Sequence, residues 1–87
     1  MTFNIELSSR AADDLKKLSR TNRNILIILS KRISSLAENP YSGKPLKGNK
    51  KGCYSLRYGN YRIIYEIYPP VKTVLIIRTG HRKEIYR

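Results

Sequence analysis

The stretch Cys53–Tyr68, CYSLRYGNYRIIYEIY, decides the fold. It contains two runs, 54–58 and 61–68, whose side chains alternate with the period of two that is typical of strands. The pair Gly59-Asn60 between them suits a two-residue hairpin turn, which needs backbone angles that these residue types adopt easily. Arg62 stands inside the otherwise apolar second run, so its side chain must face solvent, a partner or a site. The stretch therefore predicts a β-hairpin that carries an arginine in one strand.

The segment before this hairpin predicts a strand and a first helix. Residues 2–7 alternate apolar and polar side chains, as a half-buried strand does. Either Ser8 or Ser9 can then cap a helix whose apolar residues recur at helical spacing. Asp13 and Asp14 are expected near the positive end of its dipole.

A second helix and a long loop are expected next. Residues 19–22 read as a short break with a new helix cap, and a longer helix follows from about Arg23 to Glu38. Asn39-Pro40 ends it, because the residue before a proline disfavours helical geometry. Residues 41–52 contain glycine, proline, serine, asparagine and four lysines, and we expect a loop that places positive charge beside the hairpin.

One more strand is expected after the hairpin. Pro69-Pro70 turns the chain, because a proline cannot donate to a strand ladder. The run Val71–Thr79 is nearly continuous in apolar residues and predicts a central strand, and residues 81–87 read as a polar tail. The order is β-α-α-β-β-β. It predicts a single α+β domain over residues 1–87, with an antiparallel sheet and a helical hairpin packed on one face.

The charge of the chain predicts a polyanionic partner. Eighteen Lys and Arg against six Asp and Glu give a net charge of +12. Most of the excess lies in residues 44–87, with eleven basic and two acidic side chains. Nucleic acid is the commonest partner of such a surface, and an acidic protein is the alternative. We find no signal peptide and no apolar run of the length that a membrane span needs, so a cytoplasmic location without membrane association is expected.

The sequence offers few groups for catalysis. One histidine, one cysteine and scattered carboxylates do not make a metal site, and we find no phosphate-binding glycine loop or nucleophile elbow. RNA, however, carries its own nucleophile in the 2′-hydroxyl. A metal-free catalyst then needs a base, an acid, and positive charge for the phosphorane. A ribonuclease without a cofactor is therefore compatible with the composition.

Candidate residues for these tasks lie in the hairpin and the tail. The guanidinium groups of Arg57, Arg62 and Arg82 match phosphate oxygens in a bidentate way. His81 and Tyr86 are the candidates for proton transfer. Each residue also has a structural explanation: the arginines can be solvated, His81 can end a strand, and Tyr86 can pack on the sheet. The residues alone leave these alternatives open.

Three segments together resemble the RelE/ParE superfamily of toxin–antitoxin toxins. They are the loop end Pro45-Leu46-Lys47-Gly48, the hairpin with CYSLR at 53–57 and GNYRIIY at 59–65, and the string GHRKEIY at 80–86. With the predicted element order, the resemblance covers nearly the whole chain. The RelE branch consists of ribosome-dependent mRNA endonucleases. The ParE-like branch poisons DNA gyrase without the catalytic set. Arg82 and Tyr86 favour the RelE branch, whereas Arg62 occurs in both.

The resemblance also implies roles and partners. Arg62 and Arg82 would contact the scissile phosphate, and Tyr86 would orient or deprotonate the 2′-hydroxyl. RelE proteins often carry two lysines where this chain has Ser55 and Arg57, so His81 or a loop lysine such as Lys50 or Lys51 remains a candidate base. An acidic antitoxin would wrap the toxin and bind operator DNA, and the ribosome with its mRNA would be the target. A ParE-like gyrase inhibitor and a non-catalytic RNA- or ribosome-binding module are the alternatives. The residues expected to bind RNA or the ribosome are Arg57, Lys47, Lys50, Lys51 and Lys83.

Overall fold

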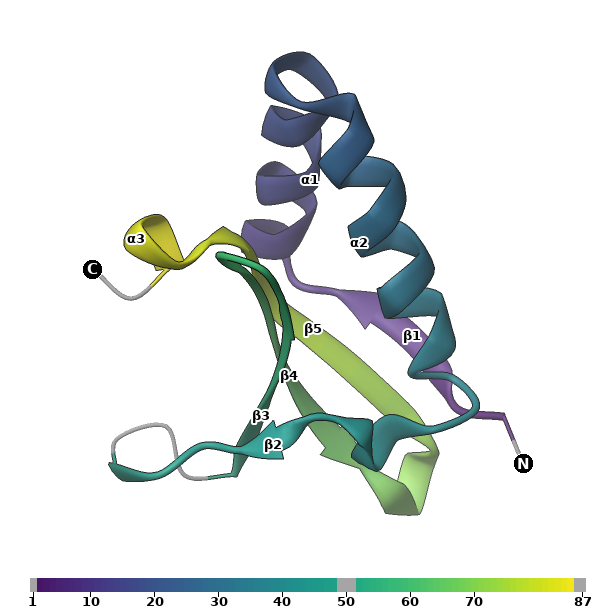
Figure 1. Ribbon diagram of the computed structural model, residues 1–87. Coiled ribbons are helices and arrows are strands. Elements are labelled where there is room, and N and C mark those ends of the chain that lie inside the picture. The colour runs from purple at the N-terminus through teal and green to yellow at the C-terminus, as the bar shows by residue number, and fades with distance from the viewer. Residues whose placement is uncertain (1, 49–51, 86–87) are drawn as a thin grey trace.

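A helical hairpin covers one face of a β-sheet in the computed structural model, and this arrangement confirms the predicted α+β class (Figure 1). The structure describes residues 2–48 and 52–85. Its elements in chain order are β1 (Asn4–Leu7), α1 (Ser9–Thr21), α2 (Arg23–Ser35), the 3₁₀ turn η1 (Pro40–Ser42), β2 (Lys44–Pro45), β3 (Cys53–Tyr58), β4 (Tyr61–Tyr68), the 3₁₀ turn η3 (Pro69–Val71), β5 (Thr73–His81) and α3 (Arg82–Ile85).

The sheet has five strands in the order β1-β5-β4-β3-β2. β3 and β4 form the predicted hairpin, in which Tyr58 pairs with Tyr61 across the turn. Gly59 in that turn has φ +57°, a left-handed conformation that glycine adopts without a steric penalty. Among the described strands β1 pairs with β5 in parallel, and the other pairings are antiparallel. The sheet is thus antiparallel as predicted, apart from its first strand.

The helix starts follow the predicted caps. The Oγ atom of Ser8 accepts a hydrogen bond from the N–H of Ala11 at 3.0 Å, so Ser8 is the N-cap of α1. The Ser8 hydroxyl also donates to the carbonyl of Ile77 at 2.7 Å, which joins the start of the helix to β5. Asn22 caps α2 by accepting from the N–H of Ile25 at 3.3 Å. Each cap satisfies an amide that has no partner within its helix.

The predicted end of the second helix at Glu38 is wrong. The helix α2 ends at Ser35, and the chain tightens into three-residue turns. The N–H of Leu36 bonds the carbonyl of Ile33 at 3.1 Å, and the next two amides repeat this pattern. Such tightening is common in the last turn of a helix and leads here into the Pro40 turn.

The prediction that Asp13 and Asp14 lie near the positive end of the α1 dipole is wrong, because the first turn of the helix contains no acidic residue. Asp14 instead turns toward β5. Its Oδ2 atom accepts from Nε of Arg78 and from the N–H of Thr79, and its Oδ1 atom accepts from Nη2 of Arg78, all at 3.1 Å. These contacts fasten α1 to the sheet.

The main core lies between the helical hairpin and the sheet. Helix and strand side chains that are at most 7% exposed pack together there. The core residues are Ala11, Leu18, Leu29, Ile33, Leu36, Ile63, Tyr65, Val74 and Ile76.

No helix within residues 2–48 and 52–85 is long and apolar enough to cross a membrane.

Two elements go beyond the prediction. The loop expected at 41–52 contains the two-residue strand β2, which pairs with β3. The polar tail expected at 81–87 begins as the last residue of β5 and continues as the single helical turn α3. Ile85 in α3 is 5% exposed. Glu84 in α3 contacts Lys17 in α1 through an exposed ion pair at 3.2 Å.

Candidate functional site

Two arginines meet on the face of the sheet that is turned away from α1 and α2. Arg57 in β3 is paired with Arg62 in β4, and Arg62 is paired on its other side with Gly80 in β5. The neighbouring pair, Leu56 and Ile63, belongs to the core between sheet and helices. Because side chains alternate along a strand, both arginines lie on the opposite face. Like charges directly opposite each other destabilise a sheet, and an anion bound between the two arginines would relieve this repulsion.

A cleft of about 410 Å³ contains both arginines. One wall comes from the chain segment that leads into and out of β2, and the other comes from β3 and β4. No carboxylate lines the cleft within the described part of the chain, so its charged groups are all cations. The lining residues are Ser42, Gly43, Lys44, Pro45, Leu46, Ser55, Leu56, Arg57 and Arg62.

Two buried polar atoms at this cleft have no partner among the described residues. They are Oγ of Ser55 and Nε of Arg62. Ser55 is only 9% exposed, and an unpaired buried polar group costs about 1–3 kcal/mol. Most buried polar groups in proteins are hydrogen-bonded. The N–H at Nε of Arg62 can only donate, so the missing partner must offer an acceptor such as a phosphate oxygen.

The buried side chain of Tyr65 holds residues 40–43, which lead into one wall of the cleft, in place. Its hydroxyl donates to the carbonyl of Pro40 at 2.7 Å and accepts from the N–H of Gly43 at 3.0 Å. The ring of Tyr54 stacks on that of Tyr65 with centroids 5.6 Å apart. Gly43 has no room for a side chain, because a Cβ atom would lie 2.5 Å from the Tyr65 oxygen and 2.8 Å from the carbonyl oxygen of Ser55. The path of residues 40–43 therefore depends on one buried hydroxyl.

Replacing Tyr65 with phenylalanine should destabilise the fold by about 1–3 kcal/mol, because two buried backbone groups lose their partner. Burial raises the pKa of Tyr65 above its ordinary value of 10.0. The folded protein thus holds this proton more tightly than the unfolded chain, and the stability it contributes falls as the pH rises through the raised pKa. Urea unfolding of both proteins below and above pH 10 measures the effect. A difference in stability that stays constant across that range would contradict it.

His81 lies away from the two arginines. It is paired with Tyr61, and the two rings meet edge to face with centroids 5.4 Å apart. Its Nδ1 atom accepts from the N–H of Lys83 at 3.2 Å. His81 lines a different cleft, of about 180 Å³, together with Asp14 and other residues of α1. The structure therefore places His81 on the helix side of the sheet, and the predicted grouping of His81 with Arg62 is not found.

The remaining predicted residues are exposed and do not line the cleft, or they lie outside the described residues. Arg82 is exposed at the start of α3, and its N–H bonds the carbonyl of Asn60 at 2.8 Å, so it is anchored at the turn of the β3–β4 hairpin. Lys47 and Lys83 are exposed. Tyr86, Lys50 and Lys51 fall outside the described residues.

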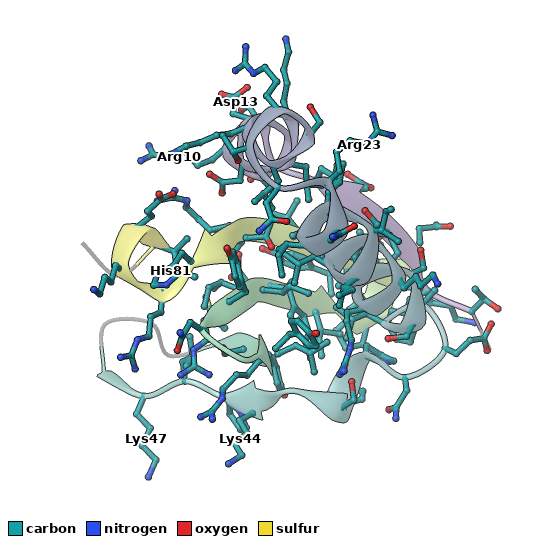
Figure 2. The ribbon with its side chains drawn as sticks, turned by 45° about the horizontal axis from the view of Figure 1, so that its top comes forward. Arg10, Asp13, Arg23, Lys44, Lys47 and His81 are labelled. Carbon is teal, nitrogen blue, oxygen red and sulfur yellow. The ribbon has the colours of Figure 1, made fainter. Side chains whose placement is uncertain are left out.

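Sequence reasoning missed Lys44 as a member of the cleft. Its strand is two residues long and contains a proline, so no alternation marks it in the sequence. Figure 2 shows Lys44 and Lys47 projecting on the side remote from Arg23 and the helices. Within the described residues no three His, Cys, Asp or Glu side chains gather in a way that could hold a metal ion.

Comparison with known proteins gives consistent matches over most of the chain. Residues 5–86 match the family model described as the ParE toxin of the type II toxin–antitoxin system parDE. The chain is 34% identical to toxin RelG of Mycobacterium tuberculosis, over 100% of this chain and 99% of that protein. It is 30% identical to toxin RelE of the same organism, over 98% of this chain and 87% of that protein.

Solved structures of toxin–antitoxin complexes share the fold. The RelBE2 complex of Mycobacterium tuberculosis contains a chain with a TM-score of 0.84 and 32% identity, covering 94% of this chain and 93% of that one. The intact RelBE complex of E. coli contains one with a TM-score of 0.74 and 22% identity, covering 91% and 95%. The described arrangement of helices and sheet is thus one that antitoxin-bound proteins adopt.

Proposed function

Because the chain belongs to the RelE/ParE family of type II toxin–antitoxin toxins, we propose that it is a ribosome-dependent endonuclease that cuts mRNA in the decoding site. Cleavage would proceed by attack of an RNA 2′-hydroxyl on the adjacent phosphate and would need no cofactor. The observation that carries this proposal is the Arg57–Arg62 pair, set in a cleft without a carboxylate in the described part of the chain. The two relatives carry RelE-type names, whereas the family model is described as the ParE toxin, so gyrase inhibition is the second candidate function.

The two arginines would act on the charge that develops in the reaction. The phosphorane carries more negative charge on its equatorial oxygens than the ground-state diester does. Guanidinium groups held on adjacent strands stabilise that charge without having to reorganise. The unpaired Nε of Arg62 supplies a donor for one of these oxygens, and the hydroxyl of Ser55 beside it supplies another.

Residues of the C-terminal segment and the loop lysines would make further contacts with the RNA. Arg82, anchored to the hairpin turn through Asn60, would contact the same phosphate. Tyr86 would orient the 2′-hydroxyl or take its proton, as the resemblance implies. Lys47, Lys50, Lys51 and Lys83 would contact RNA backbone near the cleft, and these contacts would weaken as salt is added. We assign His81 no role at the phosphate, because it lines the cleft on the other face.

An acidic antitoxin is the proposed partner that restrains this activity. A net charge of +12 fits a partner of opposite sign, and a segment that wraps the toxin would cover the cleft and exclude RNA. Two of the solved structures that share the fold are toxin–antitoxin complexes. The antitoxin would also bring the complex to operator DNA. The toxin would act in the cytoplasm, where translating ribosomes are found.

Mapping of mRNA ends after induction tests the proposed activity. We expect new 5′ ends within translated codons shortly after induction, and none when translation is blocked beforehand. A gyrase inhibitor would instead damage DNA and filament the cells while mRNA stayed intact. Arrest of growth without new mRNA ends would refute the endonuclease. Harmless overexpression would favour a non-catalytic RNA-binding module.

A further inference from the structure

We propose that Lys44 takes the proton from the 2′-hydroxyl in the cleft of Arg57 and Arg62, a role that rests on the proposed endonuclease activity. Lys44, Arg57 and Arg62 are the basic side chains that line this cleft among the described residues. Guanidinium groups do not release their protons in proteins, whereas a lysine amine exchanges its own readily. The hydroxyl groups of Ser42 and Ser55 are far weaker bases than an amine. Lys44 is therefore the group in this lining that is chemically suited to accept a proton.

The register of the sheet places Lys44 on the same face as Ser55 and Arg57. Lys44 in β2 is paired with Ser55 in β3, and Ser55 is paired with Ile64 in β4. Arg57 follows Ser55 by two residues and so lies on the same face as Lys44. Diagonal neighbours of this kind are about 7–8 Å apart at the backbone, a gap that long side chains close. The lysine, the unpaired Ser55 hydroxyl and the arginine pair thus form one continuous surface.

The side chain of Lys44 is available for this role. It is exposed and makes no hydrogen bond or ion pair with a described residue. Its backbone, in contrast, is fixed on both sides: Gly43 before it bonds the Tyr65 hydroxyl, and Leu46 after it bonds the carbonyl of Cys53 at 2.8 Å. A flexible amine on a fixed backbone can reach the ligand without moving the wall of the cleft.

The proposed step balances in protons and electrons. In this step the lone pair of the Lys44 amine takes the 2′-hydroxyl proton, and the 2′ oxygen forms a bond to phosphorus. The bond between phosphorus and the 5′ oxygen breaks, and the departing oxygen takes a proton from water. The products are a 2′,3′-cyclic phosphate and a 5′-hydroxyl end. Arg57 and Arg62 hold the non-bridging oxygens throughout, and the lysine ammonium later returns its proton to solvent.

Two substitutions separate proton transfer from simple charge. Lys44→Ala removes both the amine and the positive charge, whereas Lys44→Arg keeps the charge and cannot accept the proton. Both should lower the single-turnover cleavage of ribosome-bound mRNA by about 100-fold or more. Lys31→Ala is the matched control, because Lys31 is an exposed lysine on α2, away from the cleft, and should cut at the wild-type rate. Thermal melting of the purified variants verifies that each is folded.

Chemical rescue provides a readout that a structural role would not move. Ethylamine added to Lys44→Ala should restore part of the cleavage rate in proportion to the concentration of its neutral form, and it should not rescue Arg62→Ala. A wild-type rate in Lys44→Arg would show that only charge matters and would overturn the assignment, as would a wild-type rate in Lys44→Ala. A wild-type protein that makes no cuts would refute the endonuclease itself. Cutting that is independent of Lys44 would refute only the present inference.

Discussion

Replacing Arg62 with alanine is expected to lower the proposed mRNA cleavage by about 100- to 1,000-fold, the loss typical of removing one preorganised donor from an oxyanion-type site. Arg62 has the properties such a donor needs. It is held in the middle of the sheet by pairing with β3 and β5, and its Nε atom is buried at the cleft without a partner among the described residues. The measurement is single-turnover cleavage of ribosome-bound mRNA at saturating toxin.

Stability distinguishes this catalytic loss from unfolding. Arg62→Ala removes an unpaired buried donor and a charge that faces Arg57, so we expect melting at or above the wild-type temperature. Arg62→Lys keeps the charge but loses the bidentate fork, and its rate should lie between wild type and Arg62→Ala. Arg57→Ala should cost less than Arg62→Ala, because Arg57 is exposed. Wild-type cleavage by folded Arg62→Ala would rule out the phosphate contact.

The hairpin and its arginines could be predicted because their signals are local. Alternation over 54–58 and 61–68, with a two-residue turn between them, fixes which residues oppose each other, and Arg57 is paired with Arg62 as a direct consequence. β2 could not be predicted in this way. Lys44 and Pro45 form a strand only because β3 offers them an edge, and that pairing spans residues whose own pattern favours a loop.

The position of His81 depends on a detail that the sequence does not reveal. A register shift between Ile64 and Tyr65 interrupts the pairing of β4 with β5. Before the shift Val74 and Ile76 face the core, and after it Thr79 and His81 share that side. An uninterrupted strand would have placed His81 on the face of Arg62, because one residue of slip exchanges the two faces. This bulge is the reason why His81 does not lie beside Arg62 as the sequence predicted.

Replacing Asp14 with alanine is expected to destabilise the folded protein by about 2–4 kcal/mol, because it leaves the guanidinium of Arg78 partly buried and unpaired. The Asp14 and Arg78 side chains are only 15% and 22% exposed. The carboxylate accepts three hydrogen bonds, two from the guanidinium and one from the N–H of Thr79. Hydrogen bonding to Asp14 also raises the pKa of Arg78 above its ordinary value, so the guanidinium keeps its charge.

The second ion pair of α1 provides the matched control for Asp14→Ala. Lys17 and Glu84 meet at 3.2 Å, but their side chains are 59% and 53% exposed, and such surface pairs contribute at most about 1 kcal/mol. Glu84→Ala should therefore shift the urea midpoint far less than Asp14→Ala does. Added salt should abolish the small Glu84 effect and leave most of the Asp14 effect, because partly buried pairs are screened less. Equal midpoint shifts for the two variants would show that Asp14 acts as an ordinary surface charge. The bonds from Asp14 to β5 would then not be what holds α1 against the strand that leads to the C-terminal segment.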